Sequence, residues 1–193
     1  MDAVWLVVGL GNPGARYSTT RHNLGQMVLD ELARRRSESF RSHPTRAAVA
    51  QTRLAPGEDR MVLAKPATFM NVSGAPVAAL AGYFRIPPER IVVVHDELDI
   101  PFDSVRLKQG GSAGGHNGVR DVAAALGTDR FLRVRVGVGR PPGRTDPTDW
   151  LLRDFTATER QMLPNLVVDA ADAVEDVIRL GLVAAQQRWH SPR

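Results

Sequence analysis

The sequence predicts a single α/β domain in which helices flank a mixed and mostly parallel β-sheet. Apolar runs of strand length alternate along the chain with stretches in which apolar residues recur at helical spacing, and this alternation is typical of layered α/β folds. The chain has 193 residues, of which 43% are hydrophobic and 24% are charged, which suits one domain with a buried core. We therefore expect one domain over residues 1–193, without an internal repeat.

The first third of the chain supplies three predicted strands and one helix. Residues 4–8 are an uninterrupted apolar run that ends in a glycine-rich turn. Apolar side chains at helical spacing over residues 24–32 predict a helix, and the arginines that follow suit its C-terminus. Residues 47–54 and 61–64 are predicted as strands around a Pro-Gly turn.

The central part of the chain adds two helices on either side of a buried strand. Residues 77–84 and 119–126 each carry an apolar stripe, and Pro76 lies at the start of the first, where proline is tolerated. Between them, residues 91–94 are a continuous β-branched run of the kind found in buried parallel strands. We expect this strand at the centre of the sheet.

The last third supplies one strand and one long helix. Residues 131–138 alternate between apolar and polar side chains, with Arg133 and Arg135 on the same, polar side of the strand, where both could join one basic patch. Residues 166–178 carry a helical stripe, and the Thr-x-x-Gln sequence at residues 158–161 fits a capping box ahead of it.

Composition excludes several classes of protein. The chain contains no cysteine, which rules out disulfides, thiolate nucleophiles and cysteine-ligated metals and fits a reducing compartment. No apolar run suits a signal peptide or a membrane span, so we expect a cytoplasmic protein. The formal net charge is +4 and the pI is about 10.3. Such a surface fits a nucleic-acid partner, although many metabolic enzymes are equally basic.

Polar and titratable side chains concentrate in four segments at the ends of predicted strands or the starts of predicted helices. These are residues 9–23, 65–74, 95–99 and 110–118. In open α/β sheets, ligands bind where strand ends and loops converge, so we expect the four segments to form one pocket. His22 is suited to act there as a general base near neutral pH.

The chemistry that these segments offer is limited. The chain has neither cysteine nor a Gly-x-Ser-x-Gly sequence, so an obvious covalent nucleophile is missing. A histidine could instead take a proton from water while a carboxylate orients and stabilises the imidazole. Asparagine amides could donate to a developing oxyanion, and the glycine-rich segment could let a substrate approach the backbone closely.

Competing interpretations stay open for these segments. Gly-x-Gly-x-x-Gly at residues 9–14 matches a dinucleotide-binding fingerprint, although Pro13 removes a backbone N–H and no helical pattern follows at once. Residues 95–99 offer one histidine and three acidic groups to a divalent metal, but adjacent side chains there point in opposite directions. Asn71 and Asn117 each precede a predicted helix and could simply cap it.

Taken together, the four segments closely resemble the bacterial type of peptidyl-tRNA hydrolase. They agree with that family in sequence, order and spacing, and the resemblance runs from about residue 4 to residue 155. The matching sequences are Gly-Leu-Gly-Asn-Pro-Gly at 9–14 with Thr-Arg-His-Asn at 20–23, Lys-Pro-x-Thr-Phe-Met-Asn-x-Ser-Gly at 65–74, His-Asp-Glu-Leu-Asp at 95–99 and Gly-Gly-His-Asn-Gly at 114–118.

The resemblance implies a monomeric α/β hydrolase that cleaves the ester between a peptide and the terminal ribose of tRNA, a step in ribosome rescue during translation. It implies His22 as general base, Asp96 as the residue that holds His22 in its basic form, and Asn12 as the group that recognises the acylated amino group. It implies no metal and no cofactor. Further residues implied to contact the tRNA end, the peptide or the tRNA phosphates are Tyr17, Phe69, Met70, Asn71, His116, Asn117, Lys108 and Arg135.

The sequence departs from the family pattern at two places. Residues 102–104 lack the glycine that is usual in that turn, and the C-terminal tail is rich in alanine. Two functions of other classes also stay open. A noncatalytic RNA-binding module would not need His22 beside Asp96, and a metal-dependent phosphoesterase would lose its activity to a chelator.

Overall fold

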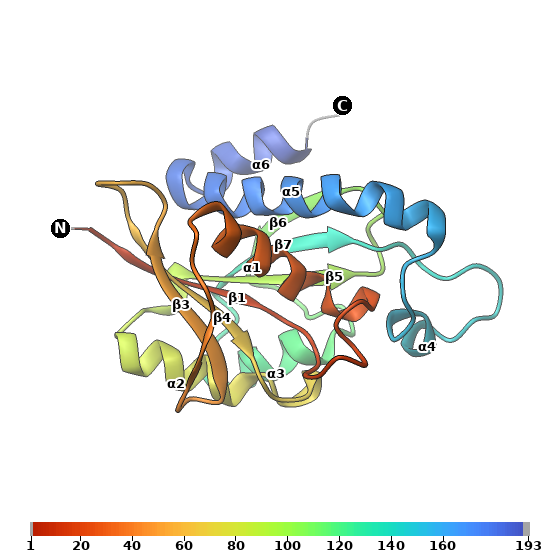
Figure 1. The fold of residues 1–193 in the computed structure, drawn as a ribbon, viewed down its shortest axis with the longest axis horizontal. Coiled ribbons are helices and arrows are strands. Elements are labelled where there is room, and N and C mark those ends of the chain that lie inside the picture. Colours follow the sequence, from red (N-terminus) through yellow and green to blue (C-terminus); the bar gives the residue numbers. More distant parts are fainter. Residues whose placement is uncertain (1, 191–193) are drawn as a thin grey trace.

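A computed structural model describes residues 2–190, and within this range the strands form one seven-stranded sheet (Figure 1). The order across the sheet is β2-β3-β4-β1-β5-β7-β6. The four central strands run parallel, whereas the outer strands pair antiparallel. The predicted mixed and mostly parallel sheet is therefore confirmed. The strands are β1 (Val4–Gly9), β2 (Arg41–His43), β3 (Ala47–Arg53), β4 (Arg60–Pro66), β5 (Ile91–Glu97), β6 (Val105–Gln109) and β7 (Leu132–Gly137).

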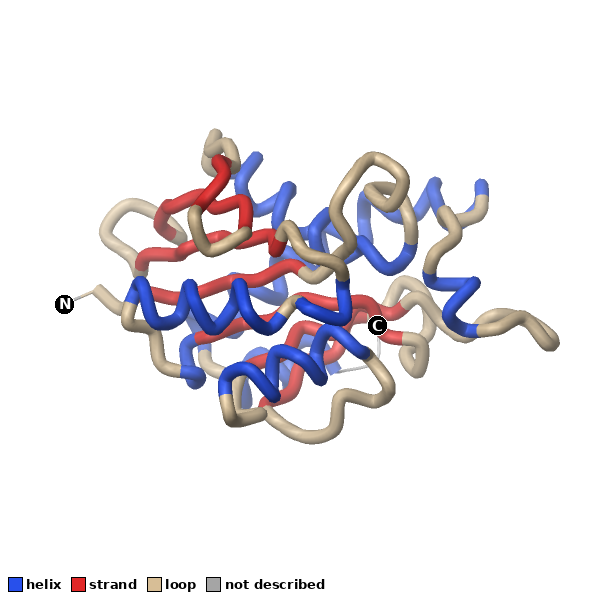
Figure 2. The backbone as a smooth tube through the Cα atoms, turned by 90° about the horizontal axis from the view of Figure 1, so that it is seen from below, coloured by secondary structure: helices blue, strands red, loops and turns tan. Residues whose placement is uncertain are grey.

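Helices cover both faces of the sheet. In Figure 1, α1, α5 and α6 lie above it and α2 and α3 lie below it, and Figure 2 shows α2 and α3 in front of the strands. No helix within residues 2–190 is both long and apolar enough to cross a bilayer. The helices are α1 (Leu24–Arg35), α2 (Gly74–Phe84), α3 (Asn117–Leu126), α4 (Pro147–Leu151), α5 (Ala157–Leu180) and α6 (Leu182–His190), with short 3-10 helices η1 (Arg21–Asn23), η2 (Met70–Val72) and η3 (Pro88–Arg90).

The central strands are buried on both faces because successive side chains of a strand point to opposite sides. On β1, Leu6 packs into the core beneath α2 and α3, and Val7 packs into the core beneath α1 and α5. On β5, Val93 belongs to the first of these cores and Val92 to the second. This alternation explains why residues 91–94 form a continuous apolar run.

Two glycines allow α1 to approach the ends of β1 and β5. A Cβ atom on Gly25 would lie 2.3 Å from the backbone oxygen of Val94, and one on Gly9 would lie 2.4 Å from the backbone oxygen of Gly25. Any larger residue would push the helix away from the sheet. The close approach places the start of α1, and η1 before it, beside the end of β5.

The central strand is longer than predicted. β5 continues to Glu97, so residues 95–97 of the polar run lie on the strand and only residues 98–99 follow it. Backbone pairing with β7 extends from Val92 to Glu97, and this pairing holds the polar residues extended where their composition alone gave no strand signal. His95 and Asp96 therefore point to opposite faces.

The long C-terminal helix begins earlier than predicted. The capping box predicted at residues 158–161 is wrong: Thr156 caps the helix and Glu159 completes the box. Glu159 also pairs with the Arg21 guanidinium at 2.7 Å, so a tertiary contact supports this start. Pro164 lies inside the helix.

Four short elements were not predicted, namely β2, β6, α4 and α6. The edge strand β6 has few residues and a mixed polarity, so it shows no clear period. It is covered by α6, in which His190 Nε2 accepts a hydrogen bond from the Leu107 N–H and Gln186 donates to the Leu107 carbonyl. In the turn before β6, Asp103 adopts a positive φ of 69°, a conformation that aspartate tolerates better than most residues. The glycine usual there is thus replaced without loss of the turn.

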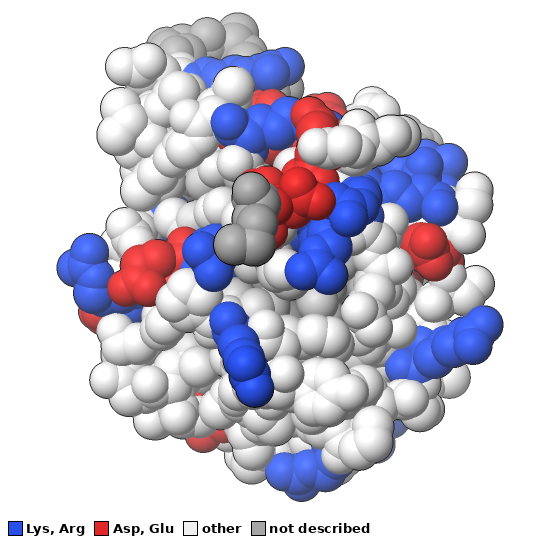
Figure 3. Space-filling view, turned by 90° about the vertical axis from the view of Figure 1, so that its left-hand side faces the viewer, with Lys and Arg blue, Asp and Glu red and all other residues white. Residues whose placement is uncertain are grey.

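Some of the charged side chains at the end of the molecule where β1 begins form ion pairs. Arg53 at the end of β3 pairs with Asp2, and Arg179 at the end of α5 pairs with Glu58 at 2.9 Å. Figure 3 views this end: acidic side chains adjoin some of the basic ones, whereas other basic side chains have no acidic neighbour in this view. The pairs join the N-terminal segment, the β3–β4 hairpin and α5.

Candidate active site

A cavity of about 470 Å³ lies at the carboxyl ends of the parallel strands. All four polar segments of the sequence reach it, as expected, and so does the segment that carries α4. The residues that line it are Asn12, His22, Phe69, Met70, Asn71, Asp96, Glu97, Leu98, Gly114, Gly115, His116, Asn117, Arg140, Pro147, Thr148, Leu151 and Leu152.

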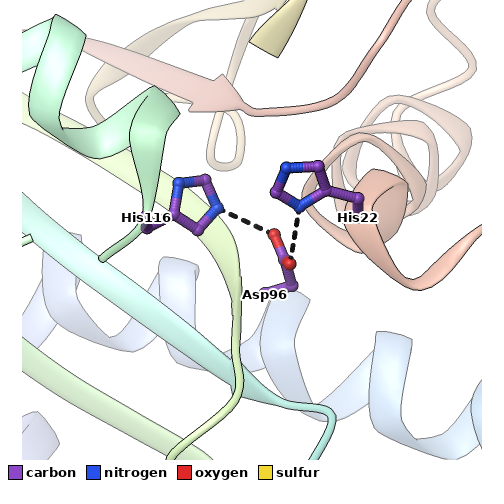
Figure 4. A group of neighbouring side chains, drawn as sticks. All are labelled: His22, Asp96 and His116. Atoms are coloured by element: carbon purple, nitrogen blue, oxygen red, sulfur yellow. Dashed lines mark hydrogen bonds and ion pairs between the residues drawn. The ribbon is translucent and has the colours of Figure 1, made fainter. Parts of the chain in front are cut away.

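Asp96 lies at the centre of the site, and its side chain is only 1% exposed. Its Oδ2 atom lies 2.8 Å from Nδ1 of His22, and its Oδ1 atom lies 2.9 Å from Nε2 of His116 (Figure 4). His22 comes from η1, and His116 is the N-cap residue of α3. Three segments that are distant in sequence therefore meet at one carboxylate.

The hydrogen bonds around His116 determine where its proton lies. Its Nδ1 atom accepts a hydrogen bond from the Val119 backbone N–H, so Nδ1 is unprotonated and Nε2 carries the proton. Nε2–H then donates to Asp96, and Nδ1–H of His22 donates to the other oxygen. The remaining nitrogen of His22, Nε2, points away from Asp96 (Figure 4) and is the unprotonated, basic atom of the ring.

The pKa values of Asp96 and His22 shift in opposite directions. Burial alone would raise the pKa of Asp96, but the two imidazoles beside it hold this pKa well below its ordinary value. Burial lowers the pKa of His22, and Asp96 more than offsets this, so the net pKa of His22 is raised. Asp96 is therefore ionised at neutral pH and stabilises the imidazolium form of His22.

Asn12 is oriented by Met70 from the segment 65–74 and by Asn23 from the end of its own segment. Its Oδ1 atom accepts from the Met70 backbone N–H at 2.7 Å, which leaves the amide Nδ2 of Asn12 as the donor at the cavity. Asn23, which is buried, accepts from the Asn12 N–H and donates to the Asn12 carbonyl, both at 2.9 Å. Asn23 was not predicted to act at the site, and its hydrogen bonds to the backbone of the first turn explain its place in the sequence motif.

The rim of the cavity carries aromatic and amide side chains. Phe69 is 57% exposed and meets Tyr17 edge to face, with ring centroids 6.5 Å apart. Asn71 and Asn117 are exposed and line the cavity, and Asn117 is the first residue of α3 rather than its cap. Met70 is buried at the cavity wall. Every predicted contact residue except Tyr17, Lys108 and Arg135 thus lines the cavity, and Tyr17 lies next to it through Phe69.

Lys108 and Arg135 lie outside the cavity, on the neighbouring strands β6 and β7. Neither forms an ion pair with any residue between 2 and 190. Burial lowers the pKa of both, and the nearby Arg133 lowers that of Lys108 further. The expectation that Arg133 shares this patch is wrong, because its side chain is buried and bonded internally to His95 and to the Ser112 carbonyl.

A further wall of the cavity, besides the four polar segments, comes from α4, which Arg21 contacts. The Arg21 guanidinium lies 3.4 Å from the centroid of the Trp150 ring and donates to the Trp150 carbonyl. Asp146 caps α4 and Pro147 follows at its first position, so the Asp-Pro sequence was a signal for this helix. Its position over the cavity depends on tertiary contacts, namely the stacking on Arg21 and the hydrogen bond from Trp150 Nε1 to the Gly139 carbonyl at 3.2 Å.

The structure also bears on the two alternative ligands. No helix starts at the glycines of residues 9–14, because the next regular element begins at Arg21, so the pyrophosphate cradle of a dinucleotide site is missing. The group His22, Asp96 and His116 has the spacing of metal ligands. Its hydrogen bonds argue against that use, because a metal would need Nε2 of His116, which carries the proton.

Comparison with known proteins identifies the family. A family model described as peptidyl-tRNA hydrolase matches residues 6–193. The chain belongs to the peptidyl-tRNA hydrolase family. A peptidyl-tRNA hydrolase from Arthrobacter sp. is 61% identical over 191 residues, which cover 99% of this chain and 98% of that relative. One from Kineococcus radiotolerans is 59% identical over 198 residues, which cover 100% of both chains.

Solved structures of the family have the same fold. The crystal structure of peptidyl-tRNA hydrolase from Acinetobacter baumannii matches with a TM-score of 0.90 and 30% sequence identity, and the match covers 100% of this chain and 97% of that one. The resemblance and the fold class drawn from the sequence are thereby confirmed, and the chain is an enzyme of this family.

Proposed function

We propose that this enzyme hydrolyses the ester between a peptide and the terminal ribose of tRNA, with His22 as the general base. The observation that carries the proposal is the Asp96 carboxylate, which binds His22 through one oxygen and His116 through the other. This arrangement leaves a basic nitrogen of His22 at a cavity and provides a buried negative charge to stabilise the imidazolium. The scheme needs only side chains and water, so we propose that neither a metal nor a cofactor takes part.

The reaction proceeds in two proton transfers. Nε2 of His22 takes a proton from water while the water oxygen attacks the ester carbonyl carbon. The bond from that carbon to the ribose oxygen then breaks, and the imidazolium returns the proton to the leaving ribose oxygen. The amides of Asn71 and Asn117 lie in the same cavity and are the donors for the developing oxyanion.

Asn12 accounts for the choice of an N-blocked substrate. Its free Nδ2–H group donates, and the acyl carbonyl of a peptidyl group accepts. An aminoacyl-tRNA carries an ammonium group at this position, which only donates and would leave Asn12 without a partner. A site that hydrogen-bonds a substrate group rejects analogues that lack this group, because its own buried polar atom is left unpaired.

The tRNA contacts divide between bases and phosphates. The exposed Phe69 and the half-buried Tyr17 offer aromatic rings beside the cavity, which suit stacking with the terminal bases. Lys108 and Arg135 form no ion pair among residues 2–190; Glu97 acts on both, and Asp129 on Lys108, only through longer-range attraction. Both cations suit the phosphates of the acceptor stem. Action as a monomer in the cytoplasm, in ribosome rescue, stays a prediction of the sequence.

The test is a pair of hydrolysis assays on the purified protein. We expect release of the acyl group from N-acetylaminoacyl-tRNA and no release from the free aminoacyl-tRNA, with the rate unchanged by excess chelator. Binding of tRNA without hydrolysis would favour the RNA-binding module, and loss of activity with the chelator would favour the metal-dependent phosphoesterase.

A further inference from the structure

Two polar side chains next to the site are fully buried and have no part in the mechanism above. His95 precedes Asp96 on β5 and is 0% exposed, and Arg133 on β7 is 2% exposed. Both lie on the face of the sheet that carries α2 and α3. Burying a guanidinium is costly unless its hydrogen bonds are satisfied, so its contacts indicate what it does.

The contacts of Arg133 connect the sheet to the glycine-rich segment, residues 110–116. Its Nε–H donates to Nε2 of His95 at 3.1 Å, and its Nη1 donates to the Ser112 carbonyl at 2.7 Å. His95 therefore carries its proton on Nδ1, which donates to the Asp96 carbonyl at 2.8 Å. Burial, together with His116 and Arg133, holds the pKa of His95 well below its ordinary value, so its ring is neutral.

The segment is anchored at its start, where the Gly110 N–H donates to the Phe131 carbonyl and the Gly111 N–H donates to Asp129, and it has few restraints beyond these two residues. Gly110, Gly111, Gly114 and Gly115 all adopt positive φ, so the unrestrained segment would sample many conformations. Over Ser112–Gly115, the bond from Arg133 is the only hydrogen bond to a different element among residues 2–190. The segment leads directly into His116, whose ring also packs edge to face on His95 with centroids 4.9 Å apart.

We propose that Arg133 is a positioning residue: its guanidinium holds the glycine-rich segment against the sheet so that His116 donates to Asp96. The inference rests on the proposed function of His22 and Asp96. Arg133 acts through His116 and touches no substrate, in contrast to its neighbour Arg135.

The first experiment compares Arg133→Lys with Arg106→Lys. Lysine keeps the charge but lacks the Nε–H and the forked geometry, so we expect Arg133→Lys to lower kcat about tenfold with KM for tRNA substrate within about twofold. Arg106 is a partly buried arginine on β6 that also binds backbone carbonyls, and Arg106→Lys should leave both parameters unchanged. A rise in KM with unchanged kcat would instead assign Arg133 to tRNA binding and overturn the proposal.

A readout without substrate separates positioning from the chemistry. Within residues 2–190, the titratable groups that face His22 are Asp96 from β5 and His116 at the start of α3. In Arg133→Lys, Asp96 should lose the hydrogen bond from His116, and its charge should then stabilise the imidazolium of His22 more strongly. The pKa of His22 should therefore rise. NMR titration of the whole protein measures this pKa. An unchanged His22 pKa in a folded variant would overturn the proposal. A raised pKa in Arg133→Lys, with His22→Ala still active, would support positioning and overturn the proposed function instead.

A double-mutant cycle tests whether Arg133 acts through His116. Arg133→Lys should cost little further rate in the His116→Ala background, and equal losses in both backgrounds would overturn the proposal. If Arg133→Lys does not fold, His95 provides the second test. His95→Gln keeps an acceptor for the Arg133 Nε–H and should retain more activity than His95→Leu, whereas equal losses would overturn the proposal.

Discussion

The basic side chains at two regions of the molecule differ in whether an acidic group pairs with them. At the end where β1 begins, Arg53 and Arg179 each form an ion pair with a carboxylate, and Figure 3 shows acidic side chains beside some of the basic ones. On β6 and β7, Lys108 and Arg135 have no such partner among residues 2–190. The two regions therefore contribute differently to the positive electrostatic potential at the surface, although both contain several cations.

This difference shows why the net charge of +4 did not locate a binding surface. A solvent-exposed ion pair neutralises itself and adds little to stability, because water and salt screen it. A cation without a partner keeps its charge available for a phosphate. Pairing, which only the folded chain displays, distinguishes a structural arginine from one that is free to bind a ligand.

The largest loss of activity is expected for substitutions at the catalytic centre rather than in either basic region. His22→Ala should lower kcat about 10²–10⁴-fold, the usual contribution of a general base, with tRNA affinity and folding unchanged. Single-turnover kinetics measures the chemical step. His43→Ala on the distant edge strand β2 is the control and should have no effect. A loss smaller than tenfold in folded His22→Ala would remove His22 from the mechanism.

Asp96→Asn should lower the rate about 10²-fold and move the acidic limb of the pH–rate profile to lower pH. The carboxylate raises the pKa of His22 against the opposing effect of burial, so removing its charge leaves burial to lower that pKa. The rate falls because the imidazole loses its oriented partner. Asp99→Asn, on the same segment but exposed, should leave the profile in place. A profile of Asp96→Asn with the wild-type height and limb would exclude Asp96.

Lys108→Gln and Arg135→Gln should act on tRNA binding without changing the chemistry. Each variant should raise KM for full-length peptidyl-tRNA about fivefold and flatten the slope of log affinity against log salt by roughly 0.7–0.9. A minimal substrate without the tRNA body should be cleaved at the wild-type rate. Equal losses on both substrates, or an unchanged salt slope, would show that these residues do not bind phosphate.

The smallest effect is expected at the opposite end of the molecule. Arg179→Gln removes one exposed partner of Glu58, so KM, its salt dependence and the midpoint of thermal unfolding should stay at wild-type values. Thermal melts and the same salt titration measure this. A salt slope that flattens as much as in Lys108→Gln would show that tRNA reaches this end and would break the contrast between the two regions.

The sequence alone determined the class of fold and the four polar segments that reach the cavity, although not the wall that α4 provides. Continuous apolar runs, one alternating run and stripes of period 3.6 identified the buried strands and main helices, because these elements bury one or both faces along their whole length. Glycine turns next to polar groups marked the strand ends at which His22, Asp96 and Asn12 meet. These signals are local, so a single chain displays them.

Only the tertiary structure decided what each polar group contacts. Asp96 binds two histidines because β5 extends to Glu97 and α1 packs closely through Gly25. Arg133 and Arg135 are equivalent by alternation, yet the glycine-rich segment covers the first and leaves the second partly exposed. Short elements such as β6 and α4 depend on a covering helix or a stacked arginine. Burial and hydrogen bonding between distant segments leave no periodic pattern, and for this reason the sequence did not reveal them.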